Sequence, residues 1–138
     1  MFVGFLRRYC FFLVLAALPI MAGCGGDGPA EYPVTGKVML DGHPVEQGEI
    51  RFLPAGMQGT PCAGQISNGN FECRATEGQK RVEIYATRES ATPAPDGLPN
   101  YVSYIPAAYN SQSTLTADIK PKGDNTLTFN LKSQTESP

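Results

Sequence analysis

Hydrophobic and polar residues alternate with a period of two along most of the chain, and turn residues interrupt the alternation at short intervals. In the segment 34–40, Val34, Val38 and Leu40 fall on one side and Lys37 falls on the other. The same pattern recurs in six further segments: 49–54, 62–67, 70–75, 80–88, 114–120 and 125–131. A period of two is typical of β-strands that bury one face. The pattern therefore predicts seven β-strands.

The predicted strands indicate the fold class. Short strands in a chain without a convincing helical stretch favour two antiparallel sheets packed face to face. We therefore predict an all-β fold, namely a seven-stranded antiparallel β-sandwich. The predicted domain covers residues 32–133, and residues 134–138 are predicted to form a disordered tail.

Two features of the connections sharpen this prediction. Asn68-Gly69 lies between two alternating segments and predicts a hairpin with a type I′ turn. The longest interruption, residues 89–113, contains four prolines: Pro93, Pro95, Pro99 and Pro106. Because proline donates no backbone hydrogen bond, we expect this segment to be a surface loop without regular strand pairing.

The N-terminal segment has the pattern of a secretory signal. Arg7 and Arg8 precede twelve uncharged residues, 10–21, a stretch that is too short for a membrane-spanning helix. Small residues, Ala22 and Gly23, then precede Cys24, as they would at a cleavage site. We predict that residues 1–23 are a cleaved signal peptide.

The stretch Met21-Ala22-Gly23-Cys24 resembles the lipobox of bacterial lipoproteins, with Met where Leu is usual. The resemblance implies a cell-envelope protein whose Cys24 carries fatty acyl chains such as palmitate. Two or three such chains hold a protein on a membrane without a spanning helix. The alternative is a secreted protein with an incidental Cys24.

The residues after Cys24 bear on how the domain is attached. The glycine-rich segment 24–31 is predicted to be a flexible tether between the lipid and the domain. No acidic residue directly follows Cys24, so the inner-membrane retention signal of some lipoproteins is missing. The outer membrane or the cell surface is therefore favoured over the inner membrane.

Charge excludes one class of partner. Removal of Arg7 and Arg8 from the 11 basic residues leaves 9 against 13 acidic residues, a formal charge of −4 for the processed chain. Neither a basic stripe nor a polyacidic tail is present. Nucleic acid is therefore not an expected partner.

Several motifs of the predicted domain resemble a known family. They are "VTGKVMLDGHPVEQGEIRFLP", "GQISNGNF", "IPAAYNSQSTLTADIK" and "NTLTFNLK". Together they resemble small lipoproteins of planctomycete-type bacteria with a transthyretin-like, carboxypeptidase-regulatory-like domain. The resemblance implies a seven-stranded prealbumin-like sandwich, but it implies no established activity, because fold is shared more widely than function.

The sequence offers little for catalysis. The chain has one histidine, His43, which lies in a predicted turn, and no recognisable nucleophile, phosphate-loop or zinc motif. Asp41, Asp118 and Asp124 have no spacing that resembles a calcium loop. We therefore expect a protein that is not an enzyme, with no catalytic residue, cofactor or metal.

Three tyrosines, Tyr101, Tyr104 and Tyr109, lie within nine residues of the proline-rich segment. Exposed aromatic rings on a rigid loop bind sugars or peptides in many proteins. The same rings would alternatively fold back and cap the sandwich, and Tyr109 is the best candidate for a core position. Tyr101 and Tyr104 remain the candidate ligand-binding residues.

Two functions follow from these observations. The first is an envelope lipoprotein with a non-catalytic structural or interaction role. The second is a lipoprotein that binds carbohydrate or peptide through the segment 89–113. The expected partners are the lipid membrane, through acylated Cys24, and an envelope protein or glycan.

Cys62 and Cys73 are the cysteines left after signal cleavage and acylation, in a compartment that permits disulfides. In the predicted hairpin Ile66 faces Phe71 and Gly64 faces Cys73, so the two cysteines are diagonal neighbours on the inward face. Diagonal Cα atoms lie about 7–8 Å apart, beyond the usual ~4.4–6.8 Å of a disulfide. A disulfide with altered register and two free buried thiols both remain open.

Overall fold

The computed structural model describes residues 28–56 and 59–133. The predicted signal peptide, Cys24 and the predicted tail 134–138 lie outside the described residues. Within them the regular structure is β-strand, apart from one short 3-10 helix, which confirms the all-β prediction. No helix in the described part of the chain is long and apolar enough to cross a membrane.

The seven predicted strands are present, and three short strands bring the total in the described residues to ten. The elements are β1 (Glu31–Leu40), β2 (His43–Pro44), β3 (Gln47–Pro54), β4 (Cys62–Ser67), β5 (Asn70–Thr76), β6 (Gly78–Tyr85), β7 (Thr87–Glu89), β8 (Tyr101–Ser103), η1 (Ala107–Tyr109), β9 (Thr116–Ile119) and β10 (Thr126–Leu131). The predicted count of seven is corrected, because β2 and β8 are too short to show a period of two and the predicted strand 80–88 is divided into β6 and the beginning of β7. β1 begins at Glu31, one residue before the predicted domain boundary.

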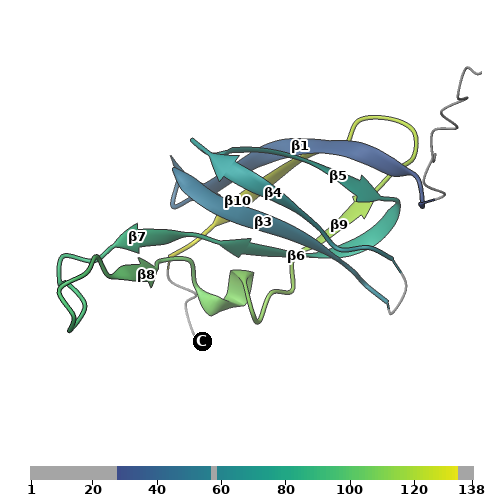
Figure 1. Cartoon of the computed structure of the whole chain (residues 1–138). Coiled ribbons are helices and arrows are strands. Elements are labelled where there is room, and N and C mark those ends of the chain that lie inside the picture. Colours follow the sequence, from purple (N-terminus) through teal and green to yellow (C-terminus); the bar gives the residue numbers. More distant parts are fainter. Residues whose placement is uncertain (1–27, 57–58, 134–138) are drawn as a thin grey trace, which may run out of the picture.

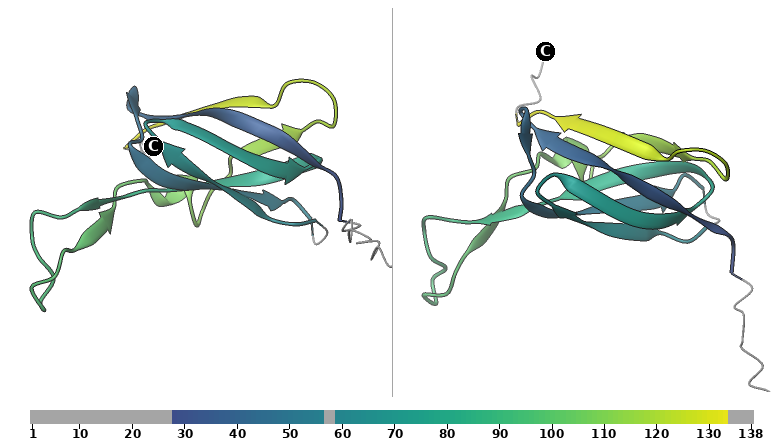
Figure 2. Two further views of the ribbon diagram at one scale, coloured as in Figure 1. Left: turned by 45° about the horizontal axis from the view of Figure 1, so that its top comes forward. Right: turned by 90° about the horizontal axis from the view of Figure 1, so that it is seen from above.

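The main strands follow one hydrogen-bonded path, in the order β10-β1-β5-β4-β3-β6-β9. The path curls so that β10, β1 and β5 form one layer over β3 and β6 (Figures 1 and 2). The predicted pair of separate antiparallel sheets is therefore corrected to a sandwich-like fold made from one continuous path. β1 and β10 are also parallel, with Gly36 beside Leu127, so the sheet is mixed.

The hairpin between β4 and β5 connects the two layers. Asn68 and Gly69 have φ angles of 48° and 77°, which confirms the predicted turn of two left-handed residues. Ile66 pairs with Phe71 as predicted. The ladder between β4 and β5 ends after that pair, while β5 stays paired with β1 and β4 stays paired with β3.

The core lies between the layers and is formed by inward residues that the alternation predicted, together with Val45 and Ile105 from the connections. Phe52 of β3 packs against Phe71 of β5 with a ring separation of 6.0 Å. Phe71 in turn lies 6.2 Å from Phe129 of β10. Fully buried aliphatic residues surround these rings: Val34, Val38, Val45, Ile50, Val82, Ile84, Ile119 and Leu131.

The proline-rich segment differs from the prediction. Instead of an unpaired loop, it contains β8, which pairs with β7 through Thr87 opposite Ser103 and Glu89 opposite Tyr101. The four prolines lie outside both strands, so they do not interrupt this pairing. We call residues 87–103 the arm, because it projects from one end of the sandwich (Figure 1).

Gly36 provides a test of the packing beneath the aromatic rings. A Cβ atom at this position would lie 2.0 Å from the Leu127 carbonyl oxygen and 2.8 Å from the Phe71 ring. Because the first of these atoms is backbone, Gly36→Ala is expected to lower the free energy of unfolding by about 3 kcal/mol. Urea unfolding of the full chain would measure the loss.

The matched control is Gly28→Ala, since a Cβ atom at Gly28 meets no atom within 4 Å. This variant is expected to unfold at the same urea concentration as the unchanged protein. Equal stability of the two variants would contradict the described approach of β1 to β10.

Candidate functional site

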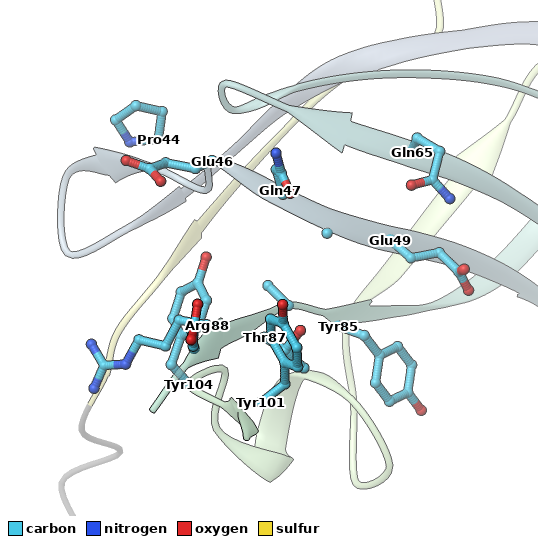
Figure 3. Close-up of a pocket in the computed structure, with 13 residues that line it drawn as sticks. Pro44, Glu46, Gln47, Glu49, Gln65, Tyr85, Thr87, Arg88, Tyr101 and Tyr104 are labelled. Atoms are coloured by element: carbon cyan, nitrogen blue, oxygen red, sulfur yellow. The ribbon is translucent and has the colours of Figure 1, made fainter. Parts of the chain in front are cut away.

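A groove runs between the outer face of the sandwich and the arm (Figure 3). Its first wall follows from strand alternation. Ile50 and Ile84 point into the core, so Glu49 of β3 and Tyr85 of β6 point away from it. Gln65 of β4 extends this polar outer face.

The arm supplies the second wall. Its base is held by the Tyr104 backbone N–H, which donates to the Ala86 carbonyl oxygen at 3.3 Å. The next residue, Ile105, is buried in the core. These contacts place Tyr101, Tyr104 and Arg88 across the groove from β3 (Figure 3).

The groove has a volume of about 820 Å³, which is within the usual range for ligand sites. Three tyrosines and three glutamates contribute to its lining. The full set is Pro44, Glu46, Gln47, Gly48, Glu49, Gln65, Tyr85, Ala86, Thr87, Arg88, Glu89, Tyr101 and Tyr104. Rings next to carboxylate and amide groups suit a polar ligand with flat or cationic parts.

Tyr85 is held by its neighbours on the outer face. Its hydroxyl donates to Glu83 Oε2 at 2.9 Å, which raises the pKa of Tyr85. The guanidinium of Arg51 lies 4.8 Å from the centre of the ring. Arg51 also pairs with Glu49, so this end of the groove contains a satisfied network.

Tyr104 and Tyr101 have different surroundings. Arg88 lies 5.8 Å from the centre of the Tyr104 ring. Burial raises the pKa of Tyr104, the Glu46 carboxylate raises it further, and the charge of Arg88 opposes both effects. Tyr101 is 62% exposed and pairs across the arm with Glu89. Tyr101 is therefore the most accessible ring of the groove.

The structure brings the predicted ligand-binding residues, Tyr101 and Tyr104, into one groove. Tyr109 does not join them, because it packs against the core and its hydroxyl accepts from the Lys132 backbone N–H at 3.2 Å. Tyr104 both packs against the core and lines the groove, so the capping and binding alternatives each describe part of the cluster.

Sequence reasoning missed the opposite wall, above all Glu46, Glu49 and Tyr85. Glu49 and Tyr85 occupy outward positions of predicted strands, and Glu46 lies in the connection before β3, so a polar side chain is ordinary at each position. They differ from other outward residues only because they lie next to the point where the arm leaves the sheet.

The residues considered for catalysis and metal binding lie apart. His43 is exposed on β2. The pKa of Asp41 is lowered by interaction with the Ser133 side chain and by the Ser133 backbone N–H, which donates to the Asp41 carboxylate at 3.1 Å. The described residues contain no group of three or more His, Cys, Asp or Glu side chains that is arranged to hold a metal ion.

Cys62 and Cys73 are both free thiols in the structure. Cys73 is buried beside Gly64, as the predicted register requires, because a Cβ atom at Gly64 would lie 3.2 Å from the Cys73 Cβ. Interaction with the Cys73 thiol lowers the pKa of Cys62, burial opposes this effect, and the charge of Lys80 lowers the pKa as well. Interaction with Cys62 raises the pKa of Cys73, as does burial.

Comparison with known proteins adds little to this geometry. No protein-family profile and no curated protein sequence matches the chain. A 9R-lipoxygenase from Cyanothece PCC8801 is similar over 74% of this chain, with 14% identity and a TM-score of 0.37. The chain spans 16% of the length of that protein, and a similarity this weak assigns no activity.

The cysteine geometry predicts an order of modification. Iodoacetamide reacts with thiolates, so the native protein is expected to be alkylated first at Cys62, which is partly exposed and has the lower pKa. Cys73 is expected to react only when the chain unfolds. Peptide mass spectrometry of the full-length protein, alkylated without reductant, measures both sites.

In the native protein we expect alkylation at Cys62 first. After denaturation we expect two alkyl groups, one on each cysteine. The Cys62→Ser variant serves as the control and should lose the fast site alone. Absence of label on both cysteines in the unreduced, denatured protein would show a disulfide and contradict the free pair.

Proposed function

We propose that this protein is a lipid-anchored, non-catalytic binding protein of a bacterial cell envelope, with its ligand in the groove between the sandwich and the arm. The ligand is a peptide or a carbohydrate. The observation that carries the proposal is the groove itself, where Tyr85 of β6 meets Tyr101 and Tyr104 of the proline-rich segment beside Glu46 and Glu89.

The exposed hydrophobic side chains favour binding over a passive structural role. Among the described residues, the large hydrophobic side chains that are exposed are Leu98, Tyr101 and Val102. All three belong to the arm. Exposed apolar residues that gather on one projecting element suit contact with a partner.

Anchoring through Cys24 agrees with the position of the first strand. β1 begins at the end of the sandwich opposite to the arm (Figures 1 and 2). A lipid attached a few residues before Glu31 would therefore leave the groove at the end of the domain far from the attachment point. This arrangement keeps the groove accessible to a ligand in the surrounding envelope.

Lipidation is tested by metabolic labelling of the producing bacterium with an alkyne analogue of palmitate. The unchanged chain is expected to carry label and to sediment with membranes, and Cys24→Ser should lose both properties. Cys62→Ser is the matched control and should keep both. Equal label on the unchanged chain and Cys24→Ser would contradict the anchor.

Binding is tested by pull-down from native membranes and by a glycan array, with the full chain as bait. Tyr101→Ala and Tyr104→Ala are expected to reduce capture of the same ligand by about fivefold or more, since each removes a ring from the groove wall. Tyr101 is exposed, so its variant should remain folded. Urea unfolding of each variant verifies this.

Leu98→Ala is the matched control, because Leu98 is 61% exposed on the arm but does not line the groove. Capture is expected to be unchanged in this variant. Capture that depends on Leu98 and is insensitive to both tyrosines would place binding at the tip of the arm and overturn the proposed groove.

A further inference from the structure

We propose that the groove binds an extended peptide segment that carries lysine or arginine, with the cationic side chain held between the Tyr101 ring and the Glu89 carboxylate. This inference rests on the proposed binding function and names the class of ligand. Four features of the described residues support it: the arginines already over two of the rings, the charge of the lining, the pairing of Tyr101 with Glu89, and the strand edges of the arm.

The first feature is the contact between arginine guanidinium groups and tyrosine rings within this chain. Arg51 lies over Tyr85 at 4.8 Å and Arg88 lies over Tyr104 at 5.8 Å. Within the described residues no cationic group lies over Tyr101, although its ring is the most exposed of the three. The face of a tyrosine attracts an ammonium or guanidinium group. Tyr101 is therefore suited to take such a group from a ligand.

The second feature is the balance of charge along the groove. Three carboxylates, from Glu46, Glu49 and Glu89, line it together with the single cation of Arg88. Glu49 is paired with Arg51, whereas Glu46 and Glu89 form no ion pair with any described residue. A cationic ligand gains attraction from these two carboxylates, and a neutral sugar does not.

The third feature is the position of Glu89 relative to Tyr101. The two residues are register partners on β7 and β8. Directly opposed residues of an antiparallel pair have Cβ atoms about 4.5–5.5 Å apart, so both side chains can contact one bound group. A lysine or arginine placed there meets an aromatic face and a carboxylate together.

The fourth feature favours a peptide over an isolated amine. β7 and β8 form a sheet of two strands, so each strand has one edge without a partner strand among the described residues. An extended peptide adds to such an edge through main-chain hydrogen bonds, while alternate side chains enter the adjacent groove. The groove and the edge then contribute to the same interaction.

The test uses the purified full-length protein in a nonionic detergent and an array of short extended peptides. Each lysine peptide is matched by one with Nε-acetyl-lysine at the same positions and by one with glutamate. Lysine and arginine peptides are expected to bind, and acetylation is expected to weaken binding by about tenfold because it removes the charge. Binding should also weaken as the salt concentration rises.

The peptide that binds most tightly is then titrated into variants of the protein by calorimetry. Glu89→Gln and Tyr101→Leu are expected to reduce its affinity by about fivefold to tenfold each. Both residues are exposed on the arm, so their substitution should leave the core unchanged. Glu77→Gln is the matched control, since Glu77 is an exposed carboxylate outside the groove. The affinity of this variant for the peptide should be unchanged.

Equal binding of lysine and acetyl-lysine peptides, or unchanged affinity in Glu89→Gln and Tyr101→Leu, would overturn the inference. Binding of a neutral glycan that depends on Tyr101, without binding of any peptide, would also overturn it while leaving the proposed groove function intact. If neither peptides nor glycans bind, and capture from membranes does not depend on Tyr101, both proposals are wrong.

Discussion

The contact between Phe52 and Phe71 holds the two layers of the sandwich together, because β3 and β5 are not neighbours in the hydrogen-bonded path. Phe129 extends this contact to β10. Gly36 leaves the space that Phe71 occupies, so the absence of one side chain permits the packing of three rings. Since β3 and β6 are fixed by this core, their outward side chains form a stable wall for the groove. The site therefore depends on residues that no ligand would contact.

Much of the fold could be predicted from local pattern. Alternation places Val34, Val38 and Ile50 inward, and the Asn68-Gly69 turn sets the register in which Ile66 faces Phe71. The parallel pairing of β1 with β10 has no local signal, because these are the first and last strands and no short turn connects them. The short strands β2 and β8 have no signal in the sequence for a different reason. Two or three residues contain too few positions for any period to be visible.

The site was less accessible to sequence reasoning than the fold. Tyr101 and Tyr104 stood out because aromatic residues cluster in one short proline-rich segment. Four prolines in one segment predict a loop without strand pairing, but the position of each proline decides the outcome. Pro93, Pro95 and Pro99 lie in the connection between β7 and β8, and Pro106 precedes η1, so all four leave the β7–β8 pairs intact. Glu46 and Glu49 approach the tyrosines only through the tertiary fold.

The placement of β1 has a mechanical consequence. β1 lies between β10 and β5 and is hydrogen-bonded to both along most of its length. It enters the sandwich at the end opposite to the arm (Figure 1). If the proposed lipid attaches the N-terminus and a ligand binds at the arm, a pull between them acts along β1, so it loads the two ladders in shear. The hydrogen bonds of both ladders then resist the pull together and not one at a time.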